Sequence, residues 1–490
     1  MNRKVLYALV NLAFIVLMAV FAASNDTVPF IYLVALFALC SSALLVARPF
    51  NGPYSILCLL LFIFFVFYGL QDVSAVLNGK LFLTGGGLPT APETVILVGG
   101  VLGVLGYLIA ARLFRPTQQP TQQVRDWPEN TVIIVGIALW ALGSWAAWIW
   151  GVDLIKDTSS STVSKALGSI SAIKTTLLML GQLAKPVGML MLAYAQAVYK
   201  RAWLLPLLIA VVAFQMFYGY VVDVKGEAMT GIVLVVMTRM LVSAKLPKVW
   251  LGVGVLFVVL IFPVFMAHRM TSSQYGADHA DTAKNIGKSI SRALEASEQE
   301  EDSGKKKSES FFERASLKGS VTTIVNKAGD TVPFRNGYTL TPLWTAFIPR
   351  LIWPDKPFVA AGQLMNTDFH ISIFRETYIS SSHLGELYWN YGWLGVLVGM
   401  PIIGLILGTV GARANLADRI SLTRLLIMIV TIRYVVWGFE GNIGVSYVMW
   451  VRSVAVIGVL HLFLTSQRRA EHSQDEVFPE AGHTRTVSVP

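Results

Sequence analysis

Long runs of apolar residues recur along the chain and are separated by short polar segments. A helix of about 20 apolar residues crosses a hydrocarbon core about 30 Å thick, so each run of this length predicts a membrane span. Twelve runs qualify: residues 5–23, 28–47, 53–70, 94–114, 131–150, 176–199, 202–222, 227–243, 249–267, 384–411, 421–439 and 444–465. The pattern predicts an all-α polytopic membrane protein with about 12 transmembrane helices.

The charged residues support this class and set an orientation. Only 14% of residues are charged, and the net charge is +10. With the N-terminus placed inside, the inner connections hold Arg48, Arg112, Arg115, Arg125, Lys200, Arg201, Lys245, Lys248, Arg413, Arg419, Arg468 and Arg469, whereas the short outer loops hold only Lys80, Lys156, Lys165, Lys174 and Lys225. This asymmetry follows the positive-inside rule, so we expect both termini in the cytoplasm and anionic lipid, not nucleic acid, as the partner of these charges.

The predicted spans divide the chain into four parts. Residues 1–267 hold spans 1–9, residues 268–383 form one large outer loop, residues 384–465 hold spans 10–12, and residues 466–490 form a cytoplasmic tail. Within the loop, 278–310 is polar without an apolar period and is predicted to be mobile.

A second segment of the loop, 338–358, is apolar but broken by prolines. It contains "FIPRLIWPDKPF", which combines Arg350, Asp355 and Lys356 with three prolines. Irregular backbone at membrane depth requires protein or water to satisfy it, so we expect a re-entrant or interfacial segment. An amphipathic interfacial helix with snorkelling cations is the alternative interpretation.

Cations gather on the same predicted side of the membrane. They include Lys225, Arg269, Arg314, Arg350, Lys356 and Arg375. Arginine pairs bidentately with phosphate oxygens and lysine adds a point charge, so the set is typical of a site for an anionic lipid head group. Lys185, Arg433 and Arg452 interrupt apolar runs, and charges at that depth usually face a bundle interior or a cavity. A structural intramembrane ion pair explains them equally well.

Motifs of soluble enzymes are absent from the sequence. There is no GxSxG elbow, no Walker loop after a strand and no HExxH, and no acidic cluster suits Mg²⁺. We therefore expect no cofactor and no metal. The glycines of "VGGVLGVLG" at 98–106 are expected to pack helices closely.

Two stretches of the chain resemble a known family. "NGYTLTPLWTAFIPRLIWPDKP" and "SSSHLGELYWNYGWLG" are similar to segments of the Wzy-type bacterial polysaccharide (O-antigen) polymerases, which have about a dozen spans and one large periplasmic loop. The matching positions are Pro349, Arg350, Trp353, Pro354, Lys356, Pro357, Gly385, Glu386, Tyr388, Asn390, Gly392 and Gly395. The resemblance covers roughly 220–400 and implies a GT-C-like fold in the bacterial inner (plasma) membrane.

The resemblance also implies a reaction and its participants. Undecaprenyl-pyrophosphate-linked glycans would be donor and acceptor, with a chain-length regulator (polysaccharide co-polymerase) and a flippase as possible partners. Cations would stabilise the leaving pyrophosphate: Arg350, Lys356, Arg314 and Arg375 first, then Arg269 and Arg433, with Tyr338 and Lys225 also in the substrate site. Glu386 or His383 would be the base, and their three-residue spacing places both on one helix face.

Other functions fit parts of this pattern. An O-antigen ligase moves glycan from the same lipid to an outer acceptor and needs nearly the same groups. A lipid-linked oligosaccharide flippase or polysaccharide exporter would carry buried charge on many spans and internal symmetry, whereas the charges here gather in one outer loop. A structural subunit of a secretion complex would need no converging cations.

Overall fold

The structure is a computed structural model, and it describes residues 3–23, 30–46, 55–77, 89–114, 127–151, 172–221, 225–243, 248–249, 252, 316–348, 352–353, 359–372, 378–413 and 421–477. Within these ranges the chain forms helices and one isolated bridge between Ala328 and Val332, and no strand. The predicted all-α class is therefore confirmed for this part of the chain.

The N-terminal half contributes the first layers of the bundle. Its elements are α1 (Arg3–Ala23), α2 (Phe30–Ser41), α3 (Ala43–Val46), α4 (Ser55–Tyr68), α5 (Leu70–Leu77), α6 (Ala91–Leu113), α7 (Glu129–Ala146) with the π-helix η1 (Ala147–Gly151), α10 (Ala172–Tyr199), α11 (Leu204–Val221) and α12 (Lys225–Ser243). Each lies on one of the predicted apolar runs or at its edge. The ninth predicted span, 249–267, falls almost wholly outside the described residues.

The C-terminal half holds the loop elements and the last long helices. The loop contributes α17 (Lys318–Lys327), η3 (Tyr338–Leu340), α18 (Pro342–Thr345) and α19 (Ala361–Phe369). The long elements that follow are α20 (Ser382–Arg413), α21 (Leu422–Thr431) with its continuation in η4 (Ile432–Val436) and η5 (Trp437–Glu440), and α22 (Ile443–Val477).

Six helices of the described chain are long and apolar enough to cross a membrane. They span Ala91–Leu113, Glu129–Ile149, Leu204–Val221, Ser382–Arg413, Leu422–Glu440 and Ile443–Leu462. Three shorter apolar helices cover Lys4–Ala19, Phe30–Ser41 and Ile56–Tyr68. These features are typical of a membrane protein, and the count of twelve spans stays a prediction.

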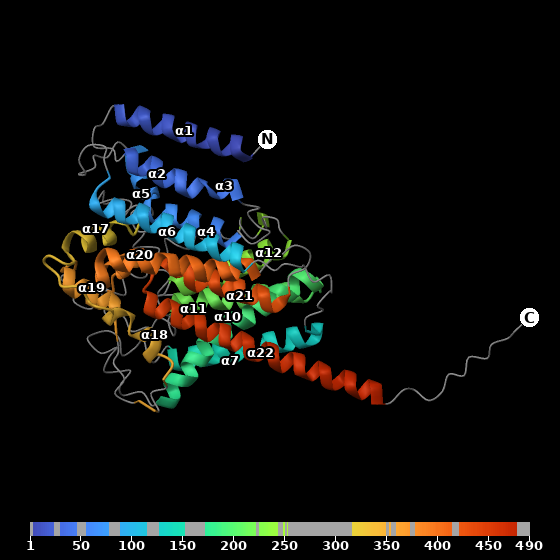
Figure 1. Ribbon diagram of the computed structural model, residues 1–490. Coiled ribbons are helices and arrows are strands. Elements are labelled where there is room, and N and C mark those ends of the chain that lie inside the picture. Colours follow the sequence, from blue (N-terminus) through green and yellow to red (C-terminus); the bar gives the residue numbers. More distant parts are fainter. Residues whose placement is uncertain are drawn as a thin grey trace, which may run out of the picture.

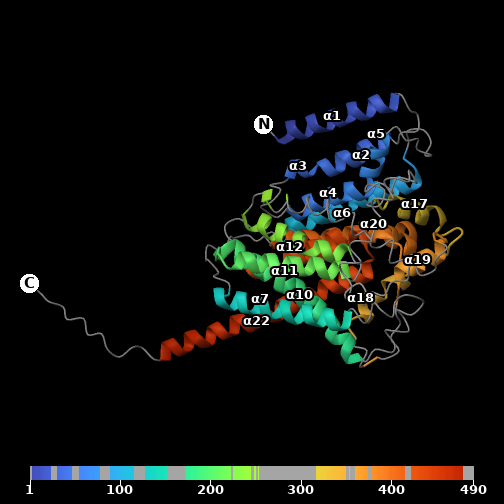
Figure 2. The ribbon, with the colours of Figure 1, turned by 180° about the vertical axis from the view of Figure 1, so that it is seen from behind.

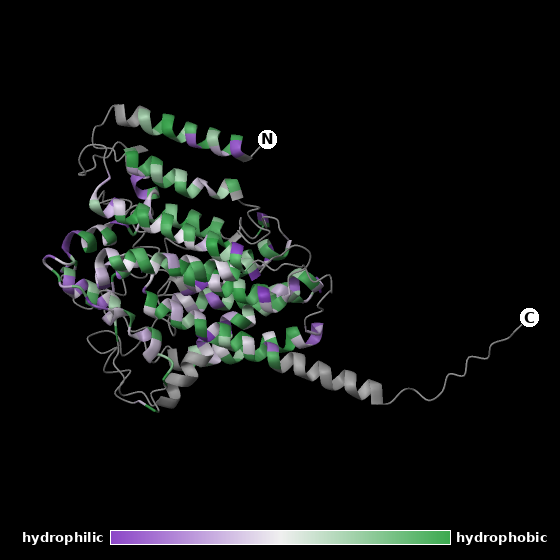
Figure 3. Ribbon diagram, viewed as in Figure 1, coloured by the Kyte–Doolittle hydropathy of each residue, from purple (hydrophilic) through white to green (hydrophobic). Residues whose placement is uncertain are grey.

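The long helices lie side by side, and the loop elements gather at one end of them (Figure 1). Both views place α17 and α19 at that end, while the start of α1 and the last turns of α22 point toward the opposite end (Figure 2). Hydropathy follows the same division, because the bundle helices are mostly hydrophobic and the α17–α19 end carries hydrophilic segments (Figure 3).

Glycines allow α6 and α20 to touch along their backbones. A Cβ on Gly404 would lie 2.1 Å from the Gly103 carbonyl oxygen, and one on Gly106 would lie 2.3 Å from that of Pro401. No larger residue fits at such a distance, so the expectation that the 98–106 glycines pack helices is confirmed.

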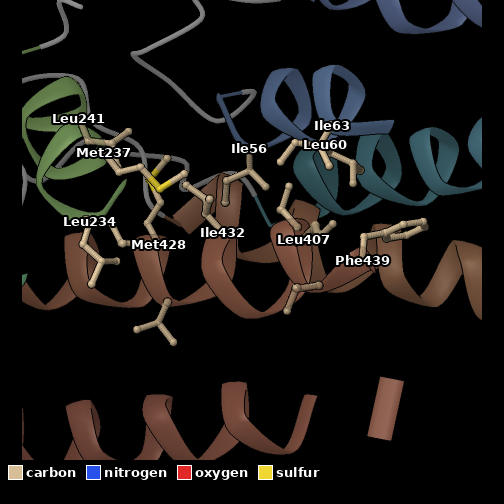
Figure 4. Close-up of a cluster of buried hydrophobic side chains, with 14 of the residues drawn as sticks. Ile56, Leu60, Ile63, Leu234, Met237, Leu241, Leu407, Met428, Ile432 and Phe439 are labelled. Atoms are coloured by element: carbon tan, nitrogen blue, oxygen red, sulfur yellow. The ribbon is translucent and has the colours of Figure 1, made fainter. Parts of the chain in front are cut away.

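Apolar side chains fill the centre of the bundle. Ile56, Leu60 and Ile63 of α4 come together with Leu407, Ile432 and Phe439, and α12 adds Leu234, Met237 and Leu241 beside Met428 (Figure 4). α4, α12 and α20 thus surround the α21–η5 helix, which changes from α to π to 3-10 geometry along its last turns. Such π segments are frequent at functional sites.

Candidate functional site

The loop helix α17 is fixed to the bundle by a buried ion cluster. Lys318 Nζ lies 2.5 Å from Asp72 Oδ2 and 2.6 Å from Glu93 Oε1. The ammonium also sits 4.4 Å from the centre of the Tyr32 ring. Burial raises the pKa of Asp72 above its ordinary value, and the nearby Lys318 charge opposes that rise. Two carboxylates thus share one cation where loop and bundle meet.

The next part of the loop is pinned to a break in α20. Tyr391 (φ −139°) and Gly392 (φ 57°) leave the helical conformation, which frees the carbonyls of the preceding turn. Arg335 N–H donates to the Trp389 carbonyl at 3.1 Å, and Asn336 N–H donates to that of Asn390 at 3.1 Å. The loop backbone thereby replaces the missing helical donors.

Asn390 adds side-chain bonds at the same junction. Its Oδ1 accepts from Gly337 N–H at 2.9 Å, and its Nδ2 donates to Thr339 Oγ1 at 2.6 Å. The side chain is fully buried. Asn390 and Gly392, two positions of the family-like motif, therefore form the joint between the loop and α20.

From this joint, residues 338–348, here called the strap, run alongside α22. A Cβ on Gly444 would lie 3.1 Å from the Thr339 carbonyl oxygen and 3.1 Å from Pro342 Cγ. Further along α22, the Arg452 guanidinium donates to the Ala346 carbonyl. Gly444 and Arg452 are about 12 Å apart along the helix axis at 1.5 Å per residue. The strap therefore follows about the first three turns of a helix long enough to cross a membrane.

Five of the predicted site cations lie outside the described residues. Arg350 follows Ala346 by four residues, a reach of at most about 14 Å. The other four cations outside the described residues are Arg269, Arg314, Lys356 and Arg375. The predicted mobile part 278–310 lies outside them as well. Lys225 starts α12, but its side chain is not described. That these cations converge on one site therefore stays a prediction.

Tyr338 stands at the beginning of the strap. Its side chain is half-exposed, and its backbone N–H donates to the Arg335 carbonyl at 2.9 Å. The phenol is therefore placed on the surface of the loop end rather than inside the bundle.

Glu386 is fully buried and binds the N-terminus of α22. Its Oε2 accepts from Ile443 N–H at 2.6 Å, and its carbonyl accepts from Asn390 Nδ2 at 2.8 Å. A carboxylate is favoured at a helix N-terminus because the unpaired N–H groups there carry positive partial charge. Oε1 has no partner in the described part of the chain. Glu386 thus has a structural role, with one oxygen left over.

His383 lies one turn before Glu386 and faces the same helix. Its ring centre is 4.9 Å from that of Phe439 and 5.5 Å from that of Tyr447. Neither ring nitrogen has a hydrogen-bond partner among the described residues, and the Tyr447 hydroxyl has none there either. Both predicted base candidates therefore contact the start of α22, in a buried junction where polar atoms lack partners among the described residues.

The charges within the apolar runs also find partners. Glu227 Oε2 lies 3.2 Å from Lys185 Nζ, and Glu227 Oε1 lies 3.6 Å from Arg433 Nη2. The sequence placed Lys185 and Arg433 inside apolar runs and left their partners open. The partner in the structure is Glu227. Isolated charges inside apolar runs indicate that such residues need partners. Which residues pair depends on how the helices pack, and this could not be read from the sequence.

Residues 152–427, more than half of the chain, match the family described as Domain of unknown function (DUF8712). The chain belongs to this family. The DUF8712 match contains Lys185, Glu227, the strap, His383 and Glu386, and it ends before Arg433 and α22. Neither a curated protein nor a solved structure matches the chain.

Proposed function

We propose that this DUF8712 protein is a polysaccharide polymerase, a glycosyltransferase that joins undecaprenyl-pyrophosphate-linked repeat units at the periplasmic face of the bacterial inner membrane. The proposal includes about 12 spans in a GT-C-like arrangement with both termini cytoplasmic. The position of α17 and α19 opposite the start of α1 and the last turns of α22 supports that topology (Figures 1 and 2).

The observation that carries the proposal is the bond from Arg452 to the strap. Arg452 belongs to a helix long enough to cross a membrane, and it holds Ala346, four residues before Arg350. A half-buried cation within a long apolar helix is costly unless it has polar partners at that depth, and a loop carbonyl is one of the partners of Arg452. A loop that brings arginine and lysine to a lipid pyrophosphate has a reason to lie at that depth.

The proposed reaction is a displacement at the anomeric carbon of the donor. The acceptor hydroxyl forms the new C–O bond, the bond from the anomeric carbon to the pyrophosphate oxygen breaks, and the hydroxyl proton passes to a base. Arg350 and Lys356 stabilise the negative charge that develops on the leaving pyrophosphate. Glu386 or His383 accepts the proton, since each has an unpaired acceptor atom in the described part of the chain.

Deletion of the gene in its host tests the cellular role. We expect single repeat units on undecaprenyl pyrophosphate to accumulate on the periplasmic side, because nothing joins them. Mass spectrometry of extracted lipids, with periplasmic exposure of the glycan measured by an added glycosidase, reports this. Accumulation of finished polymer on the lipid would instead indicate a ligase, and glycan protected from the enzyme would indicate a flippase. The reintroduced wild-type gene is the control.

A further inference from the structure

Four helices bring a charged cluster together inside the bundle. Lys185 lies near the middle of α10, Gln215 belongs to α11, Glu227 lies in the first turn of α12 and Arg433 lies in η4. Gln215 Nε2 donates to Glu227 Oε2 at 2.8 Å, the same oxygen that accepts from Lys185 at 3.2 Å. Lys185 also sits 4.2 Å from the centre of the Tyr218 ring. One carboxylate is thus the centre of the cluster.

The charges of this cluster do not balance. Lys185 and Arg433 contribute two positive charges, and Glu227 contributes one negative charge. The Lys185 side chain is only 6% exposed, so an excess cation at this depth is expensive. Among the described residues no second carboxylate pairs with either cation. The described part of the cluster therefore carries one net positive charge, which favours an anion.

Unused hydrogen-bonding atoms point to the same conclusion. Arg433 Nη1 is buried without a partner among the described residues, and its Nη2 lies 3.6 Å from Glu227, too far for a hydrogen bond. Gln215 is fully buried, and its Oε1 also lacks a partner in the part of the chain that the structure describes. Guanidinium groups bind phosphate through two parallel N–H donors, and no described residue forms a hydrogen bond with either terminal nitrogen of Arg433.

The cluster can be reached, and it lies near the proposed acid–base residues. The Glu227 and Arg433 side chains are 30% and 21% exposed. Phe439, which packs on His383, follows Arg433 by six residues, about 9 Å along the helix. A diphosphate held at Arg433 can therefore have its attached sugar beside the junction of α20 and α22.

We propose that Lys185 and Arg433 form a binding site for the pyrophosphate of a polyprenyl lipid, in which Glu227 is a resident counter-ion that the ligand displaces. The identity of the lipid rests on the proposed function, whereas the anion site rests on the cluster itself. Lys185 is a new member of the substrate site. Glu227 competes with the ligand for both cations, so removing its charge strengthens binding.

Binding of farnesyl pyrophosphate to the purified full-length protein in detergent tests this proposal. Lys185→Met is expected to weaken binding at least about tenfold, because a charged hydrogen bond to the phosphate is lost. Glu227→Gln keeps the shape of the side chain and is expected to tighten binding several-fold. Arg201→Met removes the same charge from the exposed Arg201–Glu129 pair and should leave the Kd unchanged.

The gain in affinity is decisive, because a misfolded Glu227→Gln protein cannot bind more tightly than wild type. Equal affinity in wild type, Lys185→Met and Glu227→Gln would overturn the proposal, as would weaker binding by Glu227→Gln. Farnesol should not bind, since it lacks the phosphates. Inorganic pyrophosphate binding as tightly as farnesyl pyrophosphate would overturn the lipid assignment. No acceptor is present and no bond forms, so this result is independent of whether the protein polymerises glycan.

Discussion

Arg350→Ala is expected to lower polymer formation by about 10²- to 10³-fold while the protein remains folded in the membrane. The strap ends two residues before Arg350, and Arg452 holds its last described turn through the Ala346 carbonyl. Loss of one preorganised donor that stabilises developing charge typically has an effect of this size. The measurement is the amount and length of polymer at matched protein level.

Arg350→Lys separates charge from geometry. Lysine keeps the positive charge but cannot grip two phosphate oxygens in one plane, so only part of the activity should return. Arg201→Ala, at an exposed ion pair, is the control and should leave polymer unchanged. Wild-type chain length from Arg350→Ala would mean that this residue only anchors the strap at the membrane interface.

Lys318→Met is expected to destabilise the protein by about 3–5 kcal/mol. The substitution leaves Asp72 and Glu93 buried side by side without their cation, at the point where α17 meets the bundle. The melting temperature in detergent measures the loss. Asp72→Asn is the matched control, because it leaves one carboxylate with one ammonium, and we expect a small change or a gain in stability.

The pH dependence follows from the raised pKa of Asp72. A carboxyl whose pKa is higher in the folded than in the unfolded protein binds a proton more tightly when the protein is folded. Its protonation therefore stabilises the folded state at a pH below the unfolded pKa. This stabilisation is lost as the pH rises through the folded pKa. Removing Lys318 raises this pKa further. The destabilisation by Lys318→Met should therefore be smaller at acid pH than at pH 8. Equal losses from Lys318→Met and Asp72→Asn would contradict the shared-cation arrangement.

The helices were predictable from the sequence, because long apolar runs have no other way to satisfy their backbone in a bilayer. The predicted run 94–114 corresponds to α6, which begins at Ala91 because Thr90 and Glu93 form a capping box. The loop helices α17 and α19 were not predicted. They are short, and α17 depends on the contact between Lys318 and two distant carboxylates for its place.

Only the part of the candidate site that lies on a single helix was predictable from the sequence. The three-residue spacing of His383 and Glu386 predicts that both lie on one helix face, and in the structure both contact α22. The bond from Glu386 to Ile443, 57 residues along the chain, could not be read from spacing. The pairing of Lys185 with Glu227 likewise depends on how α10 and α12 are rotated. The structure explains why the motif has a glycine at position 392, because a φ of 57° favours glycine over other residues.

The most direct test of polymerase activity is a reaction with purified protein in lipid vesicles or detergent. The substrate is a single repeat unit on undecaprenyl pyrophosphate, with no nucleotide and no second enzyme added, and products are separated by glycan length. We expect a ladder of lipid-linked products that differ by one repeat unit, with one undecaprenyl pyrophosphate released for each bond formed. Recovery of the unchanged single repeat unit from folded wild-type protein, under conditions where the lipid binds, would contradict the assignment as a polymerase.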